Sequence, residues 1–122
     1  MEIELGEVQA AFADIIWAHE PISSGELVKI CEKELNWKKP TTYTVLRKLC
    51  EKGLFKNEDG IVSSVISKEE FNASRSEKFV EETFNGSLPA FISAFMSGKK
   101  ISSKDADEIQ KLIETYRRGD HV

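Results

Sequence analysis

Apolar residues recur at three- and four-residue intervals along the first half of the chain, and this spacing predicts three short helices. The first is expected over residues 5–18, and its apolar stripe is Val8, Phe12, Ile15 and Ile16. The second is expected to follow a cap at Ser23 or Ser24. Its stripe is Leu27, Ile30, Cys31 and Leu35. The third is expected over residues 41–52, with inward positions Thr42, Val45, Leu46, Leu49 and Cys50.

A different pattern follows the third helix and predicts a β-hairpin. Two short apolar runs, 53–56 and 61–66, flank a segment rich in turn-forming residues that ends at Gly60. Three short helices followed by a hairpin is the order of a winged helix-turn-helix domain. We therefore expect a mainly α fold with a small β-hairpin wing, and we place the winged helix-turn-helix domain over residues 1–67.

The second half of the chain predicts three further helices with large apolar faces. Residues 68–122 form a unit of about 55 residues, which is too small to bury such faces by itself. We therefore expect a helical dimerisation segment, since a second copy of the chain would bury these faces symmetrically. The residues expected at the interface are Phe79, Phe84, Leu88, Phe91, Ile92, Phe95, Ile109, Leu112 and Ile113. The alternative is that these helices fold back onto the N-terminal domain of the same chain.

Composition is that of a soluble globular protein, with 40% apolar and 31% charged residues and a net charge of −4. The charge is unevenly distributed. Residues 38–56 carry a net charge of +5, whereas residues 1–37 carry −6 and residues 57–122 carry −3. Phosphate binding depends on such a local cationic patch rather than on total charge. A merely solvated basic helix face is the alternative interpretation.

In a helix-turn-helix, the second helix enters the major groove of DNA and its first residues reach the base edges. The residues expected to contact DNA are Lys38, Lys39, Thr41, Thr42, Tyr43, Thr44, Arg47 and Lys48. Arg47 can bind guanine in bidentate fashion, and the lysines, Lys52 among them, suit phosphates. The acidic tip of the wing, Glu58 and Asp59, disfavours a phosphate contact there.

The sequence offers no catalytic or metal-binding pattern. His19 and His121 are the two histidines, and neither has cysteine or histidine partners at metal-ligand spacing. A Gly-rich phosphate loop and a nucleophile elbow are both missing from the sequence. We expect no enzyme activity, metal or cofactor. Cys31 and Cys50 fall on core-facing stripes, which favours packing over a redox role, although the redox role stays open.

Apolar runs in this chain are far shorter than the roughly 20 residues that a membrane span requires, so no membrane insertion is expected. The first residues are acidic where a signal peptide is basic. We therefore expect a cytoplasmic protein.

The order of elements and several motifs resemble the penicillinase-repressor family of bacterial regulators, the BlaI/MecI type, which includes the copper-responsive CopY repressors. The first helix, from Gly6-Glu7-Val8 to Ile16-Trp17, keeps the family's tryptophan. Residues 37–54 resemble the family's recognition-helix signature, a Trp, a Thr-x-x-Thr, a basic-Leu pair and a Lys-Gly. Gly86-Ser87-Leu88 and a final acidic helix that starts at a serine match as well.

This resemblance implies a homodimer that binds a palindromic operator in double-stranded DNA and blocks transcription. Thr41, Thr44 and Lys48 then stand at the family's recognition-helix positions. An inducing protease or sensor is a further implied partner, and the matching cleavage position is Ala94-Phe95. This chain lacks the family's asparagine there, and it has no cysteine after Cys50 with which to form a copper switch. The leading alternative function is a winged-helix module that binds an acidic protein partner without specific DNA readout.

Overall fold

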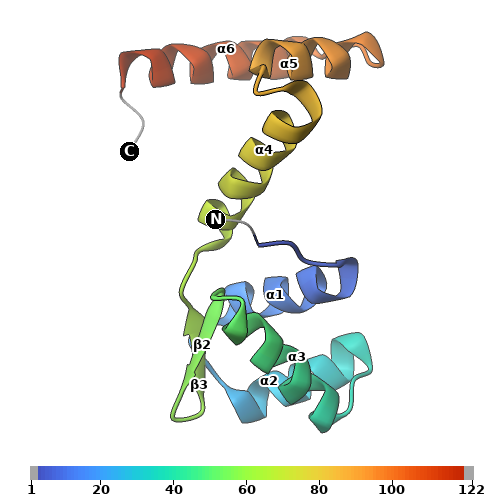
Figure 1. Cartoon of the computed structure of the whole chain (residues 1–122), viewed down its shortest axis with the longest axis vertical. Helices are drawn as coiled ribbons and strands as arrows, with labels where there is room; N and C mark the ends of the chain where they lie inside the picture. Colours follow the sequence, from blue (N-terminus) through green and yellow to red (C-terminus); the bar gives the residue numbers. More distant parts are fainter. Residues whose placement is uncertain (1–2, 120–122) are drawn as a thin grey trace. The chain divides into compact units, whose positions relative to one another are not determined.

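The computed structural model describes residues 3–119, and the order of its elements is that of a winged helix-turn-helix followed by three helices (Figure 1). The elements of the first part are α1 (Glu7–His19), β1 (Ile22–Ser23), α2 (Ser24–Leu35), α3 (Lys39–Glu51), β2 (Phe55–Glu58) and β3 (Ile61–Ser64). Those of the second part are α4 (Lys68–Phe84), α5 (Leu88–Ser97) and α6 (Ser103–Arg118). The expected fold class is confirmed.

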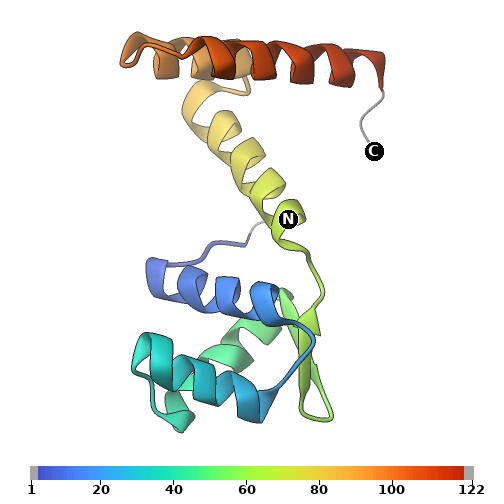
Figure 2. The ribbon, with the colours of Figure 1, turned by 180° about the vertical axis from the view of Figure 1, so that it is seen from behind.

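The three helices of the first part surround one apolar core, which the small sheet closes (Figure 2). The buried residues of this core are Phe12, Ala13, Ile16, Ile22, Leu27, Cys31, Leu46, Leu49, Leu54, Phe55, Val62 and Phe71. Burying large aliphatic and aromatic side chains stabilises a domain by about 1.5–3 kcal/mol each. Val8 was expected among the core residues of α1, but its side chain is 59% exposed. The helix begins at Glu7, after an extended Gly6, so Val8 lies in its first turn.

The first strand of the hairpin lies closer to the turn than the sequence prediction placed it, and the turn is shorter. β2 and β3 pair antiparallel with Glu58 opposite Ile61, which leaves Asp59 and Gly60 as a two-residue turn. Both turn residues have positive φ, 52° and 81°, which is the combination a type I′ turn requires. A third strand, β1, pairs with β3 and was not predicted, because two residues carry no recognisable alternation.

Trp17 of α1 joins the sheet to the start of α4. Its indole Nε1 donates a hydrogen bond of 3.0 Å to the Ile66 carbonyl oxygen. Its ring packs against Phe55 at 5.3 Å and against Phe71 at 5.6 Å between centroids. Because Phe71 is 2% exposed, the first turns of α4 belong to the core of the winged helix-turn-helix.

By its internal contacts the chain divides into two compact units, residues 1–79 and 80–122. The division falls inside α4 rather than at the 67/68 boundary expected from sequence, because Phe71 packs into the first unit. The helix itself starts where predicted. Ser67 Oγ accepts from the Glu70 amide at 3.0 Å, and a Glu70 carboxylate oxygen accepts from the Ser67 amide at 3.2 Å, a complete capping box.

The second unit contains α5 and α6, and each begins at a serine cap, of which the sequence analysis predicted the one on α6. Ser87 accepts from the Ala90 amide at 3.1 Å, and Ser102 accepts from the Asp105 amide at 3.0 Å. Gly119 ends α6 in the left-handed conformation. Within residues 3–119 no helix is both long enough and apolar enough to cross a bilayer.

Candidate nucleic-acid interface

α2 and α3 pack against each other as the two helices of a helix-turn-helix. Asn36 ends α2 in the left-handed conformation, with φ of 56°, so the chain reverses direction there. Trp37 follows and stacks on Phe12, with ring centroids 5.2 Å apart, which fixes the connection to the core. Lys38 is the N-cap of α3, and Pro40 lies in its first turn, where the missing N–H leaves no bond unmade.

Four cationic side chains lie on α3 and at its start. Lys38, Lys39, Arg47 and Lys48 are all exposed. Within the described part of the chain, none of the four forms an ion pair or a side-chain hydrogen bond. Thr41 and Thr44 are exposed on the same helix. The outer face of α3 therefore presents unpaired positive charge together with two hydroxyl-bearing side chains.

Thr44 keeps part of its hydrogen-bonding capacity. Its Oγ1 donates to the Pro40 carbonyl oxygen at 2.9 Å, within the same helix. The residue is exposed, its hydroxyl oxygen can still accept a hydrogen bond, and a threonine methyl can contact the methyl group of thymine.

Thr42 was expected both on the inward side of the third helix and among the DNA contacts, and the structure buries it. The side chain is 1% exposed and lies on the inward face of α3 with Leu46 and Leu49. Its hydroxyl oxygen has no hydrogen-bond partner of good geometry among the described residues. The group it faces is the thiol of Cys31. Thr42 therefore contributes to the contact between α2 and α3, not to a surface that DNA could reach.

Tyr43 also differs from the sequence prediction. Its side chain is half-buried against the core. Its hydroxyl donates a hydrogen bond of 3.0 Å to Ser24 Oγ, at the start of α2. No local sequence signal indicates this pairing, because the two residues lie 19 positions apart.

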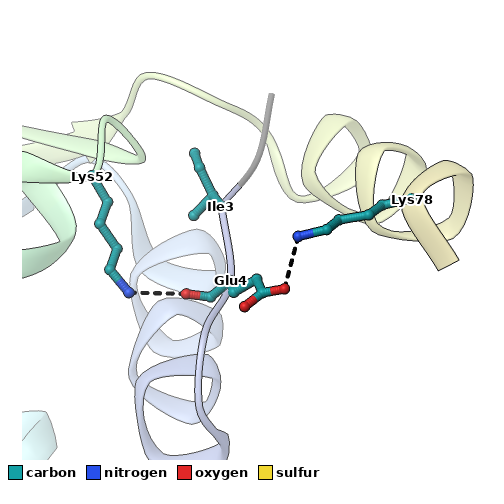
Figure 3. Close-up of a pocket in the computed structure, with 4 residues that line it drawn as sticks. All are labelled: Ile3, Glu4, Lys52 and Lys78. Carbon is teal, nitrogen blue, oxygen red and sulfur yellow. Dashed lines mark hydrogen bonds and ion pairs between the residues drawn. The ribbon is translucent and has the colours of Figure 1, made fainter. Parts of the chain in front are cut away.

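Lys52, which the sequence suggested for phosphate binding, is engaged inside the first unit (Figure 3). Its Nζ donates to the Glu4 carbonyl oxygen at 2.9 Å and to Gln9 Oε1 at 3.3 Å. The Glu4 carboxylate in turn pairs with Lys78 Nζ at 2.7 Å. The hydrogen bond and the positive charge of Lys78, and then the charge of Lys52, lower the pKa of Glu4 below its ordinary value. The N-terminal segment thus links the end of α3 to α4.

The wing carries little cationic charge of its own. Lys56 and Glu58 lie on the same strand and pair at 3.2 Å between Nζ and Oε1. The exposed tip adds Glu58 and Asp59. The wing therefore presents no surplus positive charge to a phosphate backbone, and the cationic surface of this unit is centred on α3.

The two cysteines are free thiols in a packed environment. Cys31 is fully buried and Cys50 is half-buried. Burial raises the pKa of both thiols. At Cys31 the Thr42 hydroxyl lowers the pKa in part, and the negative charge of Glu34 raises it further. At Cys50 the negative charge of Glu51 adds to the effect of burial. A raised pKa reduces the fraction of reactive thiolate, so the environment of both residues disfavours redox chemistry.

Over residues 3–119 no group of three or more His, Cys, Asp and Glu side chains is arranged to hold a metal ion. His19 is exposed at the end of α1, and His121 lies outside the described residues.

Apolar side chains remain uncovered on the second unit. Neither α5 nor α6 buries a side chain within the chain. Leu88 and Phe95 are each 58% exposed, and Leu112 and Ile113 are each 55% exposed. Phe84, Phe91, Ile92 and Ile109 are partly buried. Phe79, also expected at the interface, is 50% exposed at the end of the first unit.

Comparison with known proteins places the whole arrangement in one family. The family model described as Penicillinase repressor matches residues 5–115. A penicillinase repressor of Bacillus licheniformis is 22% identical over 118 residues, covering 93% of this chain and 92% of that protein. The methicillin resistance regulatory protein MecI of Staphylococcus aureus is 18% identical over 114 residues, covering 90% and 93% respectively. A penicillinase repressor of Staphylococcus aureus is 18% identical over 116 residues, covering 92% of both.

The matched segment begins just before α1 and ends within α6, so it includes both compact units. The resemblance inferred from the tryptophan of the first helix, the recognition-helix signature and the order of elements is confirmed. The chain belongs to the penicillinase repressor family of transcriptional regulators.

Proposed function

We propose that this protein is a sequence-specific DNA-binding repressor that acts as a homodimer on a palindromic operator. Membership in the penicillinase repressor family supports a role in transcriptional repression. The observation that carries the DNA-binding step is the outer face of α3, where exposed cations lack partners among the described residues. A DNA-binding role would also place the protein with the DNA, in the cytoplasm.

Each exposed residue of α3 has a distinct proposed role. Arg47 lies one turn beyond Thr44, on the same outer face, and is proposed to read a guanine through its N7 and O6 acceptors. Thr41 and Thr44 are proposed to contact base edges or phosphate oxygens near the start of the helix. Lys38, Lys39 and Lys48 are proposed to bind phosphates, which fix the register of the protein on the duplex without reading sequence.

A second copy of the chain is the proposed occupant of the apolar faces on α5 and α6. Side chains as large as Phe95 and Leu112 are rarely left this exposed in contiguous patches unless they form an interface. Two-fold symmetry of the dimer would match the two-fold symmetry of an inverted repeat. Half-site centres are expected about 10 base pairs, or a multiple of one helical turn, apart.

An inducing protease or sensor remains part of the proposal as an external partner. The bond between Ala94 and Phe95, which corresponds to the cleaved position in antibiotic-responsive members of the family, lies within α5. A protease requires an extended backbone, so cleavage there would need local opening of this helix.

The competing function is a winged-helix module whose basic face binds an acidic protein. Selection of bound sequences from a pool of random duplexes distinguishes the two functions. The proposal predicts enrichment of an inverted repeat. If repeated selection enriches no sequence and only weak, steeply salt-dependent binding remains, the proposal fails and the interaction module becomes the better account.

A further inference from the structure

The aromatic residue of α3 is turned away from the surface that its neighbours occupy. Thr41 and Thr44 on either side are exposed, whereas Tyr43 packs against the core and donates its hydroxyl proton to Ser24 Oγ at 3.0 Å. A hydroxyl committed to this bond is not presented to a base edge. Its position in the middle of the proposed reading helix therefore requires another explanation.

Ser24 connects this hydrogen bond to the wing. It is the first residue of α2, and its backbone amide donates to the Gly60 carbonyl oxygen at 2.8 Å. Gly60 is the second residue of the wing turn, with φ of +81°, and a Cβ built on it would lie 4.0 Å from Ser24 Oγ. The turn therefore lies close against the same hydroxyl that receives the tyrosine proton.

The surroundings of Ser24 are fixed by further bonds. Ser23 pairs with Ile61 in the sheet, and its side chain caps α2 by accepting from the Glu26 amide at 3.2 Å. The other end of β3 is held by Glu20, whose Oε1 accepts from the Ser64 amide at 2.7 Å and from its hydroxyl at 2.6 Å. These bonds position the backbone around Ser24, whose hydroxyl accepts the hydrogen bond from α3.

We infer that Tyr43 is a positioning residue for sequence readout. Its bond to Ser24 fixes the orientation of α3 relative to α2 and the wing turn, and thereby the reach of Arg47 and the threonines into the groove. This inference rests on the proposed DNA-binding function. Base contacts depend on hydrogen-bond geometry, whereas phosphate contacts by flexible lysines tolerate a displaced helix. Loss of the bond should therefore weaken specific binding selectively.

The test is a double-mutant cycle in the full-length chain with Tyr43→Phe, Ser24→Ala and the double variant. Affinities for the selected operator and for a random duplex are measured at one salt concentration. Each single substitution should lower the ratio of the two affinities by about two- to twelvefold, the equivalent of one hydrogen bond. The double variant should show no further loss, since both changes remove the same bond. Binding to the random duplex should stay within about twofold of wild type.

A control is available in Ser76→Ala, because Ser76 Oγ donates to the Asn72 carbonyl oxygen within α4 and makes no other side-chain hydrogen bond among residues 3–119. This variant should leave the affinity ratio unchanged. If Tyr43→Phe lowers the ratio while Ser24→Ala does not, the tyrosine contacts DNA itself and the inference is wrong. If both variants keep the wild-type ratio, the bond has no part in readout. If the wild-type protein itself shows no operator preference, the proposed function fails first and the inference is withdrawn with it.

Discussion

The Trp17 indole and the Ile66 carbonyl oxygen, 49 residues apart, are joined by a hydrogen bond of 3.0 Å. This bond holds the segment between β3 and α4 against α1, while the Trp17 ring fills the space between Phe55 and Phe71. Replacing Trp17 with Phe should lower the free energy of unfolding by about 1–3 kcal/mol, because the half-buried carbonyl loses its partner and the ring contacts shrink.

Urea denaturation followed by circular dichroism measures this loss, and Val8→Ala is the matched control on the same helix. Val8 is 59% exposed, so its truncation should change stability by less than about 0.5 kcal/mol. Equal destabilisation by the two substitutions would contradict the role assigned to Trp17.

Thr42→Val is expected to be neutral or stabilising. The substitution conserves volume and removes a buried hydroxyl that lacks a well-formed hydrogen bond. DNA affinity should also stay at the wild-type level, because the side chain does not reach the surface. A destabilised Thr42→Val protein would indicate that the hydroxyl makes a valuable bond to the Cys31 thiol. A loss of DNA affinity with unchanged stability would indicate that Thr42 contacts DNA after all.

Lys78 should control the titration of Glu4. Its hydrogen bond and charge lower the pKa of the Glu4 carboxyl below the ordinary value of 4.5. A carboxyl whose pKa is lowered on folding contributes stability that is present above its unfolded pKa and is lost as the pH falls through the folded pKa. Carboxyl-detected NMR of wild type should give a midpoint below 4.5, and Lys78→Met should raise it. An unchanged midpoint in Lys78→Met would show that the ion pair does not form in solution.

Arg47 and Lys48 should respond differently to truncation. Arg47→Ala should weaken operator binding by about 1–3 kcal/mol and relax the sequence preference at one position. Lys48→Ala should weaken binding to all sequences similarly and reduce the salt dependence, with the slope of log K against log salt falling by about 0.9. Titrations at several salt concentrations separate the two patterns. A uniform loss on all sequences for Arg47→Ala would make it a phosphate contact instead.

Substitution of Phe95 or Leu112 by Asp should convert the proposed dimer to monomers. Each side chain is more than half exposed in the single chain, so a charge there is tolerated by the monomer but not by an apolar interface. Sedimentation velocity measures the change, and Val8→Asp, at an equally exposed apolar site in the first unit, serves as the control. If both second-unit variants sediment as dimers, the interface lies elsewhere.

Features determined by neighbouring residues were predictable from sequence. The serine caps of α4 and α6 and the glycine of the wing turn follow from short-range backbone chemistry. The cationic patch of residues 38–56 was also predictable, because its charged residues are close together in sequence.

Features that depend on contacts between distant residues were not predictable. Helical periodicity placed Thr42 on the inward side of α3, where it is buried, but it gave no sign that the neighbouring Tyr43 packs against the core and bonds to Ser24. The sequence suggested Lys52 as a phosphate ligand, but its ammonium group donates hydrogen bonds to the Glu4 carbonyl oxygen and to Gln9 Oε1, which lie far from it in sequence. The two-residue strand β1 exists only because β3 pairs with it.

Whether α3 reads an operator as part of a dimer can be measured by equilibrium titration of the wild-type protein. The duplexes compared are the selected inverted repeat, the same repeat with one half-site scrambled, and random DNA. Two copies of the chain are expected on the intact repeat, with an affinity at least about 1,000-fold above that for random DNA. Scrambling one half-site should clearly lower the affinity. Equal affinity for the intact repeat, the scrambled repeat and random DNA would show that the protein does not read an operator as a dimer.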